Sequence, residues 1–219
     1  MALRSTLRRW HVWLGWLIGV PMLFWTLSGV IMVIRPIEEV RGTALLRPEA
    51  PVTMATPPLA PQLDGLQVQS LKLAARSSGP RWVITTADGK SRMADPATGG
   101  LVADYGAADA VREVQARYTG EATVASTARV DPANPPSDLR RDMPGWQVTM
   151  SDGTHFYVDS GSGEVVARRT RWWRFYDFMW GLHIMDLETR EDTHHPFLVG
   201  FGIVALIGTP SSQSRVYSA

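Results

Sequence analysis

WVITTADGKSRMADPATGGLV, residues 82–102, decides the fold, because the chain carries a second version of it, WQVTMSDGTHFYVDSGSGEVV, at residues 146–166. The two stretches align without a gap at an offset of 64 positions, and seven of the 21 aligned residues are identical. The shared positions include an opening tryptophan, an Asp-Gly pair and an Asp-x-x-x-Gly segment. This pattern predicts a duplicated structural unit.

Each version is typical of a β-hairpin. Alternating β-prone residues lead to the Asp-Gly pair, where glycine accepts the positive φ that a tight turn requires. A second strand then reaches the Asp-x-x-x-Gly turn, and a third short strand follows. The repetition of aspartates at turn positions favours turn formation over a pair of catalytic acids. These aspartates are Asp88, Asp95, Asp152 and Asp159.

The residues around the hairpins complete a small domain over residues 62–168. Residues 107–118 have helical spacing, with Asp109 as an acid in the first turn, and residues 63–77 are a weaker helical candidate. His155 lies in a strand beside a turn, and we interpret it as an ordinary surface residue. The expected fold class is α+β, with antiparallel hairpins and helices.

The segment before this domain separates it from an apolar helix. Residues 38–61 are expected to form a linker, because Arg47 to Pro61 is rich in proline and lacks apolar runs. Upstream, residues 12–34 form a run of 23 residues without a charge. At about 1.5 Å per residue such a helix is roughly 34 Å long, enough to cross a hydrocarbon core of about 30 Å. Pro21 is tolerated inside a membrane span.

The charges beside this run predict its orientation. Arg4, Arg8 and Arg9 precede it, so we expect residues 1–37 to hold a cytoplasmic start and a transmembrane helix, with residue 36 onward exported. A cleaved signal peptide is the alternative, but its apolar region would be only about 7 to 15 residues and would end at a small-x-small site. The run is longer and no convincing site follows it. A retained anchor is therefore favoured.

The last part of the chain, residues 169–219, returns to apolar sequence. Residues 172–187 place aromatic residues and methionine on one helical face, which predicts an amphipathic helix in the membrane interface. Residues 196–208 form a second apolar run, roughly 20 Å long as a helix, which is short for a span. This run is either a short or truncated second membrane segment, or a span completed by weakly polar residues.

The overall composition excludes several classes of function. The formal net charge is +1 over 219 residues, so no electrostatic footprint for nucleic acid is present. The absence of cysteine removes disulfides, thiolate metal sites, a cysteine nucleophile and covalent c-type haem attachment. The sequence holds no H-E-x-x-H, G-x-S-x-G or phosphate-binding glycine loop. We expect no nucleic-acid partner and no catalysis by this chain alone.

These segments resemble a PepSY-domain protein that carries the PepSY-associated transmembrane helix. RRWHVWLGWLIGVPMLFWTLSGVIM, residues 8–32, resembles the first span of that family. The repeated W-x-V/I-x-x-x-D-G … D-x-x-x-G-x-x-V pattern resembles the PepSY hairpin unit. RRTRWWRFYDFMWGLHIMD and HHPFLVGFGIVAL resemble the segment that returns to the membrane. The resemblance runs from about residue 8 to residue 207.

The resemblance implies a bacterial inner-membrane protein with its PepSY domain in the periplasm, acting as a module that binds other proteins. Larger membrane-bound relatives include iron-regulated proteins and ferric-siderophore reductases that carry haem on membrane histidines. This chain has far fewer spans than the reductases, and its last apolar run breaks at Gly208-Thr209-Pro210, where the family stays apolar. The small number of spans argues against an electron path across the membrane through a single copy of this chain.

Haem is therefore the cofactor for which the histidines are candidate ligands. His11 lies at the start of the first span, on a helical face with Gly15 and Gly19. A ligand beside a surface free of bulky side chains suits haem. The alternative is that Gly15 and Gly19 pack against another span, in a homo-oligomer or with a membrane-protein partner, while His11 sits at the headgroup level.

His183 and His195 are the candidates at the other membrane surface. His183 belongs to the amphipathic segment, and His195 precedes a proline that would fix the start of the last helix. Bis-histidine haem is one interpretation, a metal site with Asp186 or Asp192 is a weaker one, and interfacial histidines without a ligand are the third. His194 is expected to point toward the acidic loop and water.

His11 and His183 should lie on opposite sides of the bilayer, so one haem cannot use both. The leading interpretation is a periplasmic PepSY protein that is anchored in the inner membrane. It is expected to act as a non-catalytic binding or accessory module, and its expected partner is the lipid bilayer. The alternative is a haem-binding electron-transfer component linked to ferric-siderophore reduction. In that case His11, His183 and His195 are the expected haem ligands.

Overall fold

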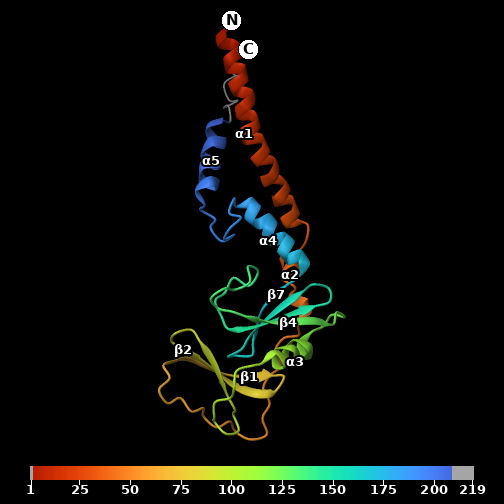
Figure 1. Cartoon of the computed structure of the whole chain (residues 1–219), viewed down its shortest axis with the longest axis vertical. Coiled ribbons are helices and arrows are strands. Elements are labelled where there is room, and N and C mark those ends of the chain that lie inside the picture. Colours follow the sequence, from red (N-terminus) through yellow and green to blue (C-terminus); the bar gives the residue numbers. More distant parts are fainter. Residues whose placement is uncertain (1, 209–219) are drawn as a thin grey trace, which may run out of the picture. The chain divides into compact units, whose positions relative to one another are not determined.

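The computed structural model describes residues 2–208, whose helices and strands form two compact units (Figure 1). The first unit comprises the N-terminal residues up to Pro36 together with the chain from Arg174 onward. The second unit runs from Ile37 to Trp173. The second unit has helices and two antiparallel sheets, which confirms the α+β prediction, whereas the described part of the first unit is helical with loops.

The second unit contains two antiparallel sheets. The first has the strand order β1-β2-β3, with bounds Val68–Arg76, Gly79–Thr86 and Ser91–Ala94. The second has the order β4-β5-β6-β7, with bounds Val124–Val130, Gly145–Met150, His155–Asp159 and Val165–Arg169. Helix α3, Ala107–Arg117, lies between the sheets in sequence, and Asp109 accepts the backbone N–H of Gly106 at 2.9 Å. The predicted helix and its early acid are thereby confirmed.

The two predicted hairpins form with corresponding registers. Trp82 pairs with Ala94 in the first, and Trp146 pairs with Val158 in the second. The glycine of each Asp-Gly turn has a φ of 79°. Each of the four repeated aspartates accepts a backbone N–H within its own turn. The prediction that these carboxylates build turns is confirmed.

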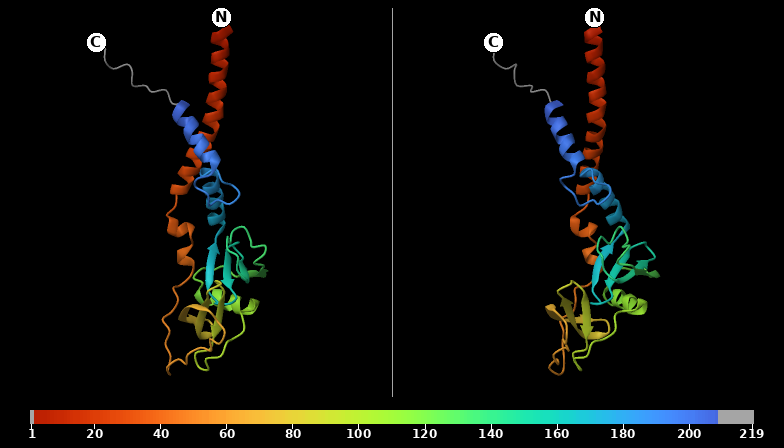
Figure 2. Two further views of the ribbon diagram at one scale, coloured as in Figure 1. Left: turned by 90° about the vertical axis from the view of Figure 1, so that its left-hand side faces the viewer. Right: turned by 60° about the vertical axis from the view of Figure 1, so that its left-hand side comes forward.

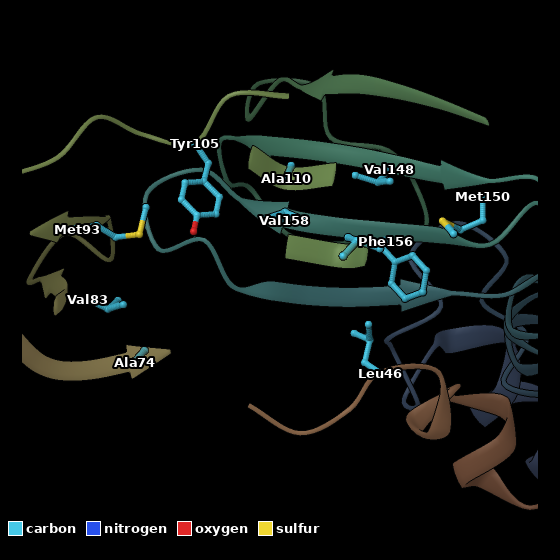
Figure 3. Close-up of a cluster of buried hydrophobic side chains, with 11 residues drawn as sticks. Leu46, Ala74, Val83, Met93, Tyr105, Ala110, Val148, Met150, Phe156 and Val158 are labelled. Carbon is cyan, nitrogen blue, oxygen red and sulfur yellow. The ribbon is translucent and has the colours of Figure 1, made fainter. Parts of the chain in front are cut away.

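One apolar core joins both sheets and α3 (Figure 3). Its buried members are Leu46, Ala74, Val83, Met93, Tyr105, Ala110, Val114, Val148, Met150, Phe156 and Val158. A smaller core consists of Val130, Leu139, Met143, Tyr157 and Ala167. Because neighbouring strand residues point to opposite faces, Phe156 and Tyr157 place these cores on the two faces of the second sheet. That sheet is thus covered on both sides.

The residues before the first hairpin differ from the sequence prediction. Residues 63–77 were expected as a weak helix, but strand β1 occupies most of this segment and pairs antiparallel with β2. The prediction was wrong because long-range strand pairing outweighs the marginal stability of a short helix. The expected linker, residues 38–61, begins with ordered turns, α2 at Ile37–Val40 and a 3-10 helix at Thr43–Leu45, and contributes Leu46 to the core.

The first unit is built on α1, a continuous helix over Ala2–Val33 that passes through Pro21. Among the helices of residues 2–208, only α1 is long and apolar enough to cross a membrane. Its large apolar side chains are exposed, as at Trp13 and Trp16. Helix α5, Pro196–Gly208, lies beside α1 (Figure 2).

Helix α4, Arg171–His183, ends before Leu187, which was expected to share its face. The end has a local cause. The N–H of Asp186 donates to Gly181 O at 2.9 Å, while Met185 takes a φ of 58°. This left-handed residue closes the helix, so Leu187 belongs to the following loop.

Candidate functional site at the α1–α4 histidine

His183, the last residue of α4, packs against α1 near the end of its apolar run. Its Nδ1 lies 3.1 Å from Ser28 Oγ and 3.1 Å from the carbonyl oxygen of Trp25. The imidazole stacks on the Trp25 indole, with centroids 4.8 Å apart and 17° between the ring planes. A Cβ on Gly29 would lie 3.2 Å from His183 Cε1, so a small residue there lets the ring approach the helix. Spacings of three and four place these α1 residues on one face.

The partners of Nδ1 determine the tautomer of the neutral His183 ring. The Trp25 carbonyl can only accept, and the Ser28 hydroxyl donates to that same carbonyl at 2.9 Å. Nδ1 must therefore carry the proton, which leaves the lone pair on Nε2. An Nδ1–H held by a backbone carbonyl is the arrangement that orients metal-ligating histidines. The same bonds also satisfy a histidine whose role is only to pack two helices together.

The loop after α4 is organised around the carboxylate of Asp186, which is 3% exposed. This carboxylate accepts the Thr189 hydroxyl and the backbone N–H groups of Glu188, Thr189, Glu191 and Asp192. The Thr189 hydroxyl, followed by the backbone donors, holds the pKa of Asp186 far below its ordinary value. Asp186 therefore shapes the loop, and no cluster of metal-ligating side chains is found among residues 2–208.

Two further contacts fold this loop back onto α4. Arg190 Nη1 lies 2.6 Å from Asp177 Oδ2, and Asp177 is buried. Trp180 Nε1 donates to the carbonyl oxygen of Arg190 at 3.0 Å. Gly181 leaves room for the arginine stem, because a Cβ there would lie 2.8 Å from Arg190 Cγ. These contacts thus hold the loop between His183 and His195 in a defined conformation, a role that the sequence did not reveal.

His195 lies where α5 begins. Its carbonyl oxygen accepts the N–H of Leu198 at 2.9 Å and of Val199 at 3.2 Å, and its ring stacks on Phe197 with centroids 5.3 Å apart. Its Nδ1 is buried, with no hydrogen-bond partner among the described residues. His194 is exposed, as expected from its position beside the acidic loop. Within residues 2–208, no ring contact or hydrogen bond joins His195 to the His183 ring.

His11 lies far from the His183 site along α1. Fourteen residues separate it from Trp25, which corresponds to about 21 Å of helix rise. His11 is exposed, and a Cβ added at Gly15 or Gly19 would meet no atom within 4 Å. Within residues 2–208, nothing therefore covers Gly15 or Gly19, and His11 is too far from His183 along α1 for both to bind one haem.

His155 is not the ordinary surface residue that the sequence suggested. Its Nδ1 lies 2.9 Å from Asp138 Oδ2, and its side chain is only 23% exposed. The Tyr157 hydroxyl donates to the other oxygen of the same carboxylate, and Arg169 Nε donates to the Asp138 backbone oxygen at 2.6 Å. These bonds tie the loop before β5 to strands β6 and β7. Sequence reasoning missed the cluster because Asp138 lies in a loop without a recognisable pattern.

Comparison with known proteins relates this arrangement to a family. A family model described as the PepSY-associated TM region matches residues 8–209. Comparison with curated proteins and with solved structures gives no match. The family match includes α1 from residue 8 onward, both sheets, α4 and the whole of the C-terminal apolar run at residues 196–208. The chain therefore belongs to the family of the PepSY-associated TM region.

Proposed function

We propose that this protein is a non-catalytic binding and accessory module, anchored in the bacterial inner membrane, with a duplicated PepSY-type unit on the periplasmic side. The observation that carries the proposal is the use of the four repeated aspartates. Each accepts a backbone N–H in its own turn, so the repeats use their acids to shape hairpins. Such a unit offers a shaped surface to a partner, and α1 keeps that surface at the membrane.

The orientation of α1 gives the first test. The arginines before the apolar run favour a cytoplasmic N-terminus, which leaves residues 36 to 195 in the periplasm. A reporter that works only in the cytoplasm should therefore be inactive when fused after Arg47. The same reporter fused to the N-terminus serves as the control and should be active. Activity after Arg47 would contradict the proposed topology.

A second candidate function is a haem-binding electron-transfer component linked to ferric-siderophore reduction. The tautomer of His183 favours it, since Nδ1 donates to the Trp25 carbonyl and leaves Nε2 as the ligand atom. The Nδ1 of His195 is buried and has no hydrogen-bond partner within residues 2–208, which also fits a residue that binds a ligand. His183 and His195 would hold haem at one end of α1, and His11 would serve at the other. Bound haem would supply one-electron transfer.

A visible absorption spectrum of the detergent-solubilised full-length protein separates the two functions. The binding-module proposal expects no stoichiometric Soret band, and a stoichiometric band would overturn it. If the band is present, His183→Ala and His195→Ala should each lose the haem of their shared site, because each removes one axial ligand. His194→Ala is the matched control and should keep its haem. Loss with His194→Ala while His195→Ala retains haem would reverse the assignment.

A further inference from the structure

The chain enters and leaves the second unit at neighbouring places. It enters at Ile37, directly after the apolar run, and leaves at Trp173. Arg168 Nε donates to the carbonyl oxygen of Arg41 at 3.2 Å, and a Cβ on Gly42 would lie 3.4 Å from Thr170 Cγ2. The end of β7 therefore lies against the residues that follow α2. Arg41 follows Ile34 by seven positions, so the connecting chain can span at most roughly 25 Å between the apolar run and Arg41.

Cations gather at this end of the unit without carboxylate partners. Arg41 and Arg171 are exposed, and Arg168 is half-buried. No ion pair of these three residues is found in the part of the chain that the structure describes. Burial, and then the nearby Arg117, lowers the pKa of Arg168. An arginine in such surroundings gains more than usual from a bound anion.

Two tryptophans accompany these arginines. Trp172 and Trp173 are both half-buried. The guanidinium carbon of Arg169 lies 4.0 Å from the centroid of Trp173, and that of Arg140 lies 5.9 Å from it. Stacked arginine and tryptophan side chains form a surface that is both cationic and apolar. Tryptophan is enriched where proteins meet the headgroup layer.

We propose that this arginine–tryptophan patch, defined as Arg41, Arg168, Arg171, Trp172 and Trp173, binds the phosphates of anionic phospholipid headgroups. Charge complementarity and the short chain connection to the apolar run carry the inference. A guanidinium presents parallel donors that match a phosphate, and each arginine near an anionic surface adds to the attraction.

Acidic residues also lie close to the patch in the sequence or the structure. Glu38 and Glu39 are exposed on α2. Asp152 directly precedes Gly153, where an added Cβ would lie 2.6 Å from Arg171 Nε. Within the described residues, none of these acids forms an ion pair with Arg41, Arg168 or Arg171. The headgroup proposal requires α1 to be in a membrane, but not a particular side of the bilayer or a particular function. Its failure would leave the proposed function standing.

Hydrogen exchange of the full-length protein in lipid nanodiscs tests the patch. One nanodisc contains phosphatidylcholine alone, and the other contains phosphatidylcholine mixed with phosphatidylglycerol. The backbone amides of residues 37–46 and 165–173 should exchange more slowly with the anionic lipid, by about five-fold for each arginine that contacts a headgroup. Added salt should remove the difference, because exposed charges are screened. Equal exchange in the two lipids would overturn the proposal.

A matched pair of variants assigns the effect to the patch. Arg41→Gln/Arg171→Gln removes two exposed patch arginines and should bring the exchange ratio of the two nanodiscs close to one. Arg92→Gln/Arg129→Gln removes two exposed arginines elsewhere in the unit and should keep the wild-type ratio. An equal loss in both variants would reduce the effect to net charge and overturn the proposal. Protection by soluble glycerol phosphate in phosphatidylcholine nanodiscs would also overturn it, in favour of a free phosphate ligand.

Discussion

Replacing Phe156 with alanine is expected to lower the free energy of unfolding of the second unit by about 3–5 kcal/mol. The side chain is 0% exposed and belongs to the core that both sheets share. Its ring meets Tyr118 edge to face, with centroids 5.6 Å apart and 75° between the planes. Alanine would leave a cavity at this position and lose the aromatic pair. Chemical denaturation of the full-length protein, followed by far-ultraviolet circular dichroism, measures the loss.

Two further variants calibrate that result. Leu101→Ala removes an apolar side chain that is 45% exposed, and it should change stability by no more than about 0.5 kcal/mol. Phe156→Leu keeps most of the buried volume and should fall between the two. If Phe156→Ala were no more destabilising than Leu101→Ala, the shared core would be refuted.

The hairpins could be predicted from sequence because their determinants are local. An Asp-Gly pair fixes a turn within four residues, through the positive φ of glycine and the aspartate side chain. The helix at 107–117 is equally local, since its spacing and its early acid lie within a few turns of each other. A structural element whose determining residues lie close together in the sequence can therefore be predicted from the local pattern.

Strand β1 could not be predicted because its determinant lies elsewhere in the chain. Residues 63–77 have a weak helical spacing, and what makes most of them a strand is the hydrogen-bonding edge of β2. One contact of the linker is similar, since Leu46 pairs with Tyr118 in an isolated bridge. Neither partner is visible in the local pattern. Long-range pairing overrides weak propensity.

In the candidate site, too, the local interactions had a sequence signal and the distant partners had none. The sequence identified His183 as a residue of an amphipathic helix, but its partners Ser28 and Trp25 lie more than 150 positions away, as the separation of 155 to Ser28 shows. Asp186 was considered as a metal ligand, whereas it accepts hydrogen bonds from four of the next six residues. The Asp-x-x-Thr spacing to Thr189 was the available signal for a side-chain turn. This spacing alone would have predicted that Asp186 shapes the loop.

The second large effect is expected at Arg76, whose side chain is 1% exposed. Arg76 belongs to β1 of the first sheet, and its Nε donates to the carbonyl oxygen of Ser162, next to the second sheet, at 2.8 Å. Its Nη1 lies 2.9 Å from Glu49 Oε1. Its Nη1 also donates to the carbonyl oxygen of Ala75 at 3.0 Å. Arg76→Met keeps much of the stem but leaves all three acceptors without the guanidinium. We expect a loss of about 3 kcal/mol, the lower end for breaking a buried ion pair, because Glu49 retains some access to water.

The Glu49 carboxylate gives this loss a pH signature. Burial alone would raise the pKa of Glu49, but the charges of Arg76 and then Lys72 outweigh burial and lower it below the ordinary value of 4.5. A carboxyl with a lowered pKa in the folded state stabilises the protein fully above the ordinary value, and this stabilisation is lost as the pH falls through the lowered value. The difference in stability between wild type and Arg76→Met should therefore be largest near neutral pH and shrink below about pH 4.5.

Lys72→Met is the control, since Lys72 is 61% exposed and should contribute less than about 1 kcal/mol. A difference that stays constant into acid would show that Arg76 acts through the carbonyl oxygens of Ser162 and Ala75 alone, and would contradict the ion pair as the source of the effect.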